Sequence, residues 1–291
     1  MAKKTMKRLA CNVLALASVF ACAGTLSACE TSNPEVKLIL TFDGKDYELE
    51  YKLYRKITPT TVNHFLYLVE NNYYDNLCVH NFDTEGKKMY TGGYKVDDGD
   101  TGIQYVNYYE TIKTFKNFSD FPVSVWLKNN KTNPSYTLYG EFEKNNFRVE
   151  NGALKENFGS LTMYYHAKDT EAYSYSEYLN ADKAGELATR NYKYNSATSL
   201  FYISLAADET SNTGYCTFAT LENADELTAL QTAIGEYITE HYGDEATNSD
   251  FVESHSVTVD ADDPVVLDGS LVSFKVPNSP ITIKDIEIVK Y

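Results

Sequence analysis

The sequence predicts a mainly β domain with two helices, in which antiparallel strands close into a barrel that carries two long insertions. Residues 36–42 and 47–54 predict two strands, and the Asp-Gly pair between them is a hairpin signal. Residues 271–276 and 281–291 predict two final strands, which suit a barrel whose first and last strands pair. The apolar phase of the last strand shifts near Lys284, which predicts a β-bulge there.

Two helices are expected. Thr58 can cap the first helix, and Pro59 suits its first position. Apolar residues then recur at helical spacing until about Asn71. Asn223 is a candidate cap for the second helix, which should extend to about Tyr242 and end at a glycine. Residues 244–264 are acidic and predict an exposed connection.

The first residues predict export. A basic start precedes an apolar stretch, residues 9–23, that suits a secretory signal better than a membrane span. Residues 26–29, Leu-Ser-Ala-Cys, resemble a bacterial lipobox, in which cleavage precedes the cysteine and the cysteine carries lipid. We therefore expect a signal peptide at 1–28 and a lipidated tether at 29–35. The alternative is an ordinary signal peptide with a chance cysteine.

Charge limits the partners. The chain has 26 basic and 41 acidic residues, a net charge of −15. Cleavage before Cys29 would leave 22 basic residues and a net charge of −19. This excess of acid argues against binding to nucleic acid and against electrostatic attachment to anionic lipid. Lipid on Cys29 would then anchor an extracytoplasmic domain to the bacterial cell membrane.

No pattern predicts a metal or a cofactor. The five histidines lack metal-ligand spacing, and no phosphate loop, dinucleotide fingerprint or hydrolase elbow is present. The acidic residues 97–100 hint at calcium but lack the full loop of oxygen ligands, so a solvated turn is the simpler interpretation. Cys78 and Cys216 could form one disulfide, but we expect two buried thiols.

Three segments in order, residues 80–82, 89–93 and 195–203, resemble the groove of the cyclophilin-type peptidyl-prolyl isomerases. The family reads Phe-His-Arg, Met-x-Gln-Gly-Gly and Ser-Gln-Phe-Phe-Ile at these places. Shorter matches continue the resemblance at residues 140–142, 146–147, 159–163 and 214–218. The resemblance implies a cyclophilin-like barrel over residues 36–291, with a groove that holds proline-containing peptides.

The resemblance also assigns site residues. Asn81 takes the position of the catalytic arginine, but it is neutral and lacks the five-donor guanidinium. Losing one transition-state donor costs ~2.7–4 kcal/mol in other preorganised sites, so we expect turnover weakened by about 10²-fold or more, unless Lys87, Lys88 or Arg148 substitutes. Lys88 itself falls where a pocket phenylalanine is expected, and either Tyr215 or Cys216 falls where a ring closes the pocket. The candidate substrate-binding residues are Met89, Thr91, Leu200, Tyr202 and Tyr215.

Structural interpretations compete with these roles. His80 is expected to be a buried strand residue rather than a catalyst. Met89 and Tyr202 can be ordinary core residues or can line a functional pocket. Thr91 and the two glycines after it can be a tight turn that needs glycine.

The matches are interrupted by two insertions, at about 94–134 and 164–194, both rich in tyrosine, asparagine, lysine and aspartate. Phenylalanines and valines between residues 115 and 126 predict that the first insertion packs, for example as an added strand. The second lies at a connection that borders the groove in the family, so it could form a lid.

Three functions follow from the sequence. The first is a monomeric, membrane-anchored isomerase-like protein of weakened activity that acts on X–Pro bonds of exported proteins. The second is a non-catalytic module that binds proline peptides or proteins in the same groove. The third is a structural or interaction protein in which the tyrosine-rich insertions bind a partner and the groove is filled.

Overall fold

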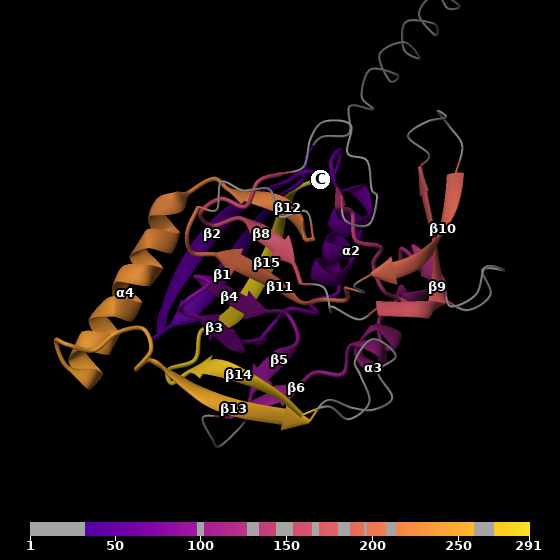
Figure 1. The fold of residues 1–291 in the computed structure, drawn as a ribbon. Helices are drawn as coiled ribbons and strands as arrows, with labels where there is room; N and C mark the ends of the chain where they lie inside the picture. Colours follow the sequence, from indigo (N-terminus) through magenta and orange to yellow (C-terminus); the bar gives the residue numbers. More distant parts are fainter. Residues whose placement is uncertain are drawn as a thin grey trace, which may run out of the picture. The chain divides into compact units, whose positions relative to one another are not determined.

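The computed structural model describes residues 33–97, 102–126, 134–143, 154–164, 169–179, 187–194, 197–207, 214–258 and 271–291 (Figure 1). The chain from Asn33 onward forms one compact unit. The expected signal peptide, the lipidated Cys29 and most of the tether lie outside the described residues. Within those ranges, no helix combines the length and the apolar character needed to cross a bilayer.

An eight-stranded antiparallel sheet forms the centre of this unit (Figure 1). Its strands, in spatial order, are β15 (Thr282–Lys290), β1 (Glu35–Phe42), β2 (Lys45–Leu53), β12 (Cys216–Leu221), β8 (Leu161–Met163), β11 (Phe201–Ser204), β4 (Lys88–Thr91) and β3 (Asn81–Asp83).

The sheet is a curled, open ladder, so the prediction of a closed barrel is wrong in that respect. Its two end strands, β15 and β3, do not pair. Instead, the residues before β3 reach β15. Val79 donates a backbone hydrogen bond to Ile281 at 2.8 Å, and Ile283 donates one to Leu77 at 2.7 Å. The strand at this edge is too short to complete the ladder, and a few hydrogen bonds from an irregular segment join the ends.

The first hairpin and the pairing of the first and last strands are confirmed. β1 and β2 are joined by a loop of Asp43 and Gly44, which both have positive φ, 48° and 72°. Such a two-residue turn matches the twist of the strands that it joins. β1 also pairs with β15 along its other edge.

The bulge in the last strand is confirmed as well. Ile39 lies opposite Asp285. The next residue, Leu40, lies opposite Ile283, so Lys284 is the extra residue. Lys284 is exposed while Ile283 is buried, and the shift keeps apolar residues on the core side in both halves of β15.

Three α-helices lie within the described residues: α2 (Pro59–Glu70), α3 (Tyr108–Lys113) and α4 (Ala224–Tyr242). The two long ones are the predicted helices, and α3 corrects the expected number. It belongs to the first insertion and covers less than two turns, too short for a clear periodic pattern.

The predicted N-cap positions, Thr58 before α2 and Asn223 before α4, are confirmed, but neither side chain makes the capping hydrogen bond. Thr58 makes no side-chain cap hydrogen bond to α2. The buried Glu141 does so from far along the chain, accepting from the backbone N–H groups of Thr60 at 3.0 Å and Thr61 at 2.9 Å. The Asn223 side chain makes no capping bond to α4 either, because its amide bonds to the backbone of β2. Local spacing cannot reveal partners that tertiary structure supplies.

The main core lies between the sheet and α2, which packs against β12 and β15. Phe65 of α2 meets the rings of Phe201 and Phe218 at centroid distances of 5.7 and 5.1 Å. The longer α4, orange in Figure 1, packs against β2. Its buried stripe consists of Leu227, Leu230, Ile234 and Ile238.

The insertions build their own elements. The first contributes β5 (Tyr94–Val96), β6 (Ile103–Tyr105), α3, the 3-10 helix η1 (Phe118–Asp120) and β7 (Val125–Trp126), and the second contributes β9 (Asp169–Leu179) and β10 (Leu187–Tyr194). The first packs, as predicted: the ring of Phe121 lies 5.1 Å from that of Tyr67 on α2. The two insertions also join each other, because β7 pairs with β9 in a sheet of order β10-β9-β7. The lid over the groove stays a prediction.

A second hairpin follows α4. β13 (Val252–Thr258) pairs with β14 (Leu271–Pro277), and the hairpin lies beside β3 and β6. The last two predicted strands are therefore confirmed, but the connection expected at 244–264 contains a strand. Its sequence, VESHSVT, is mostly polar, and the apolar alternation that predicts a strand is weak.

Candidate functional site

The pleat of β4 and β11 divides the candidate residues between two faces. Tyr90 of β4 lies opposite Asn81 on one side and Tyr202 on the other, so these three side chains share one face of the sheet. Met89 lies opposite Phe82 and Ile203 and faces the core. We call the face that carries Tyr90 and Tyr202 the tyrosine face, and we define it by Tyr90, Tyr164, Tyr202 and Tyr215.

The tyrosine face is a connected group of rings. The ring of Tyr90 lies 5.4 Å from that of Tyr164 and 5.2 Å from that of Tyr202. Tyr215 adds a ring 6.2 Å from Tyr202 in an edge-to-face arrangement. Tyr202 is buried and the other three are half-buried. Burial, with a neighbouring negative charge at Glu156, raises the pKa of Tyr202 well above its usual range, so its hydroxyl stays protonated.

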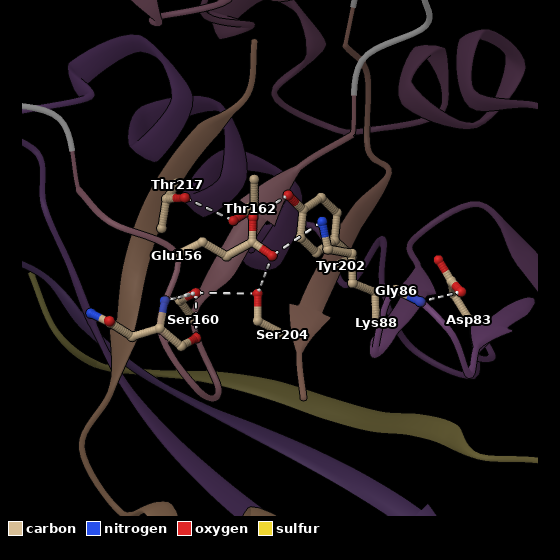
Figure 2. Close-up of polar contacts among 10 residues, drawn as sticks. Asp83, Gly86, Lys88, Glu156, Ser160, Thr162, Tyr202, Ser204 and Thr217 are labelled. Atoms are coloured by element: carbon tan, nitrogen blue, oxygen red, sulfur yellow. Dashed lines mark hydrogen bonds and ion pairs between the residues drawn. The ribbon is translucent and has the colours of Figure 1, made fainter. Parts of the chain in front are cut away.

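A buried carboxylate organises the floor of this face (Figure 2). Glu156 accepts hydrogen bonds from the Tyr202 hydroxyl at 2.9 Å and from the Ser204 hydroxyl at 3.0 Å. Lys88 forms an ion pair with the same carboxylate at 3.2 Å, and its Nζ lies 4.5 Å from the centroid of the Tyr202 ring. Beside them, the hydroxyls of Thr162 and Thr217 are 2.9 Å apart. The floor is thus polar as well as aromatic.

Asn81 stands on the tyrosine face side of β3, but its carboxamide oxygen is engaged. That oxygen accepts a hydrogen bond of 2.9 Å from the backbone N–H of Lys275 in β14. The side chain therefore holds the hairpin of β13 and β14 against the edge strand. Its NH₂ group is a neutral donor in place of the guanidinium expected from the resemblance.

Met89 and Thr91 lie on the core side. Both have no exposed surface, and Thr91 donates a hydrogen bond of 2.8 Å to the carbonyl of Cys78. The structure does not bring them together with Tyr202.

The glycines after Thr91 allow two segments to approach closely. Gly92 has a φ of +95°, and a Cβ on it would lie 2.3 Å from the carbonyl oxygen of Ser199. A Cβ on Gly93 would lie 2.6 Å from Leu200. Leu200 therefore packs against the glycine turn, and the prediction that this turn needs glycine has a steric basis.

His80 is buried, as the structural interpretation expects, with 3% of its surface exposed. Its ring lies between those of Tyr94, at 4.5 Å, and Phe274, at 4.9 Å, and its Nδ1 has no hydrogen-bond partner. Burial lowers the pKa of His80 to about 3, so the ring is neutral. A neutral imidazole packed between two aromatic rings suits a structural role for His80.

The cysteine interpretation is confirmed: Cys78 and Cys216 are buried thiols that are not joined in a disulfide. Cys216 faces the core, with its Sγ 3.4 Å from the hydroxyl of Thr61, which leaves Tyr215 as the residue beside Tyr202. Among the described residues, no group of three or more His, Cys, Asp or Glu side chains is arranged to hold a metal ion.

Sequence reasoning missed Tyr90, Tyr164 and Glu156. Strand alternation offered a signal for Tyr90, because a residue between two core-facing positions of β4 must lie on the other face. Tyr164 directly follows the Gly-Ser-Leu-Thr-Met match and could have been included with it. Glu156 lies in an irregular segment, and no spacing connects it with Lys88 or Tyr202.

Comparison with known proteins agrees with this picture. The family model described as cyclophilin type peptidyl-prolyl cis-trans isomerase/CLD matches residues 38–249. Two crystal structures of a Cryptosporidium parvum cyclophilin type peptidyl-prolyl cis-trans isomerase are similar, each at 16% identity. One covers 89% of this chain with a TM-score of 0.42, the other, in the presence of the dipeptide Ala-Pro, covers 88% with a TM-score of 0.41, and 99% of each of those chains is covered. No curated protein matches significantly. Since the family model spans most of its length, the chain belongs to the cyclophilin type peptidyl-prolyl cis-trans isomerase family.

Proposed function

We propose that this protein is a peptidyl-prolyl isomerase of weakened activity that assists the folding of exported proteins at the membrane surface. One observation carries the proposal. The tyrosine face gathers rings around Tyr202, where the resemblance places the proline pocket, while Asn81 takes the place of the arginine and bonds to β14.

The chemistry explains why activity would be weakened and not lost. Rotation about an X–Pro bond faces a barrier of ~18–20 kcal/mol, and a catalyst needs only to hold the ring and favour the twisted amide. Aromatic rings can supply the first requirement. Stabilisation of the twisted amide is weaker, because Asn81 offers a neutral amide donor where a guanidinium is expected. Loss of one transition-state donor costs ~2.7–4 kcal/mol in other enzyme sites.

The proposed location rests on the sequence before Asn33. The basic start, the apolar stretch and the Leu-Ser-Ala-Cys segment support export and lipid attachment at Cys29. Clients would then be exported proteins with X–Pro bonds. In the producing bacterium, we expect the unmodified chain to incorporate labelled palmitate and the Cys29→Ala chain not to incorporate it. Equal labelling of both chains would contradict the anchor.

The isomerase proposal is tested on residues 33–291, which form one compact unit. A protease-coupled assay with a proline tetrapeptide should show weak acceleration at micromolar protein. Asn81→Arg combined with Leu200→Gln should raise the rate, while Asn81→Ala should not, although it too breaks the bond to Lys275. If the unmodified domain does not accelerate isomerisation, the proposal of isomerase activity is refuted.

The second candidate is a non-catalytic module that binds proline peptides on the same face. The engagement of Asn81 by β14 favours it, because the side chain at the arginine position then serves the fold. This candidate predicts saturable binding of the tetrapeptide without acceleration. Absence of binding would exclude it.

A further inference from the structure

We propose that Lys88 and Glu156 form a latch over the floor of the proline pocket, and that this pair sets how tightly the pocket binds proline. The inference rests on the proposed function, since it concerns the same site. Figure 2 shows the arrangement: Lys88 reaches Glu156 beside Tyr202.

The first observation is that Lys88 covers part of the Tyr202 ring, on which the proposed function places the proline. Its Nζ lies 4.5 Å from the centroid of the Tyr202 ring, within the range of a cation–π contact. A prolyl ring stacked on the same side of Tyr202 would need that space. The lysine side chain is only 20% exposed, so it lies along the pocket rather than in solvent.

The second observation is that Glu156 binds both the Lys88 ammonium and the Tyr202 hydroxyl. Its side chain is 2% exposed, and it holds the Lys88 ammonium at 3.2 Å and the Tyr202 hydroxyl at 2.9 Å. The Ser204 hydroxyl donates a third contact at 3.0 Å. Ring and ammonium therefore have a common anchor on neighbouring strands.

The third step concerns what opens the latch. Lys88 can swing toward solvent, because its side chain is partly exposed, but Glu156 cannot follow it. Opening therefore leaves a buried carboxylate without its cation, which is strongly unfavourable. The closed arrangement is the resting one, and a proline ligand must displace Lys88 from both Tyr202 and Glu156.

The test compares four variants of residues 33–291 with the unmodified domain by NMR titration with a proline tetrapeptide. Lys88→Met removes the cation, Glu156→Gln removes its anchor, and the double variant removes both charges and leaves no buried charge unpaired. Lys56→Met, at an exposed residue outside the tyrosine face, is the matched control for loss of one positive charge. Thermal unfolding shows which variants fold, and the double variant keeps the test valid if Lys88→Met does not.

We expect the double variant to bind at least about tenfold more tightly than the unmodified domain, because the ligand no longer has to break the cation–π contact or the buried ion pair. Lys56→Met should bind as the unmodified domain does. Unchanged or weaker binding by the double variant would overturn the latch, and weaker binding would mark Lys88 as a group that contacts the ligand.

The outcomes separate the latch from the proposed function. Activity in the unmodified domain with no gain in the double variant refutes the latch alone. Binding or activity only in the double variant supports the latch and refutes native isomerase activity. No binding by any variant refutes both.

Discussion

The two faces of β4 and β11 differ in chemistry although their residues alternate along the same strands. On the core face, Met89, Phe201 and Ile203 are apolar and have no exposed surface. On the other face, Lys88, Tyr90 and Tyr202 surround a buried carboxylate. Met89, Phe201, Ile203 and the two glycines keep the family motif. The substitutions fall on both faces, with Asn81 on the tyrosine face and Thr91 on the core face.

The largest expected effect comes from the core face. Phe201→Ala would remove a ring that packs between Phe65, at 5.7 Å, and Tyr74, at 5.5 Å. We expect a loss of about 3–5 kcal/mol in the free energy of unfolding, measured by urea titration. A loss below about 1 kcal/mol would mean that the core face is not the main support of this sheet.

The next largest effect is expected in the glycine turn, Gly92 and Gly93, which follows β4. Gly92→Ala places a Cβ on a residue with a φ of +95° and 2.3 Å from a backbone oxygen, so strain and overpacking add to about 2–4 kcal/mol. Gly44→Ala is the matched control, because Gly44 also has a positive φ, +72°, but has open space around it. Its cost should be about 1–2 kcal/mol. Equal costs by thermal unfolding would contradict the close approach to Ser199.

Acid should weaken the fold through His80. Its pKa is about 3 in the folded protein against 6.5 as the usual value, so the unfolded chain takes up the proton first. The stability that depends on a neutral His80 is complete above pH 6.5 and is lost as pH falls toward 3. Between pH 7 and pH 5 the loss is about 2 kcal/mol.

His80→Phe should reduce this pH dependence by about half, because phenylalanine fills the slot between Tyr94 and Phe274 without titrating. The remaining half comes from the buried His64, whose pKa burial lowers to about 4. The exposed His241 of α4 provides the control, and His241→Gln should leave the slope as it is. Urea midpoints measured from pH 7 to pH 5 give the comparison. An unchanged slope in His80→Phe would show that His80 is accessible to protons in the folded state.

The smallest effect is expected on the tyrosine face. Tyr202→Phe keeps the ring but removes the hydroxyl that donates to Glu156, which retains Lys88 and Ser204. We expect a loss of about 1–2 kcal/mol in the free energy of unfolding. A loss as large as that of Phe201→Ala would remove the contrast between the faces.

The sequence allowed the ordered motifs, the first hairpin, both long helices and the bulge at Lys284 to be predicted, because each depends on local spacing or turn chemistry. It did not reveal Glu141 as the cap of α2 or Glu156 beneath Tyr202. Both carboxylates act on strands or helices distant in the chain, and only tertiary structure brings them there. The open sheet was missed for the same reason, since closure depends on how residues 77–79 meet β15.

The central claim is that a proline ligand binds the tyrosine face and not the core face. NMR titration of residues 33–291 with a proline tetrapeptide tests it directly. We predict that the ring signals of Tyr90, Tyr202 and Tyr215 shift saturably, while those of Phe201 and the Met89 methyl stay in place. Saturable shifts confined to residues away from these tyrosines, or no shifts at millimolar peptide, would contradict the account.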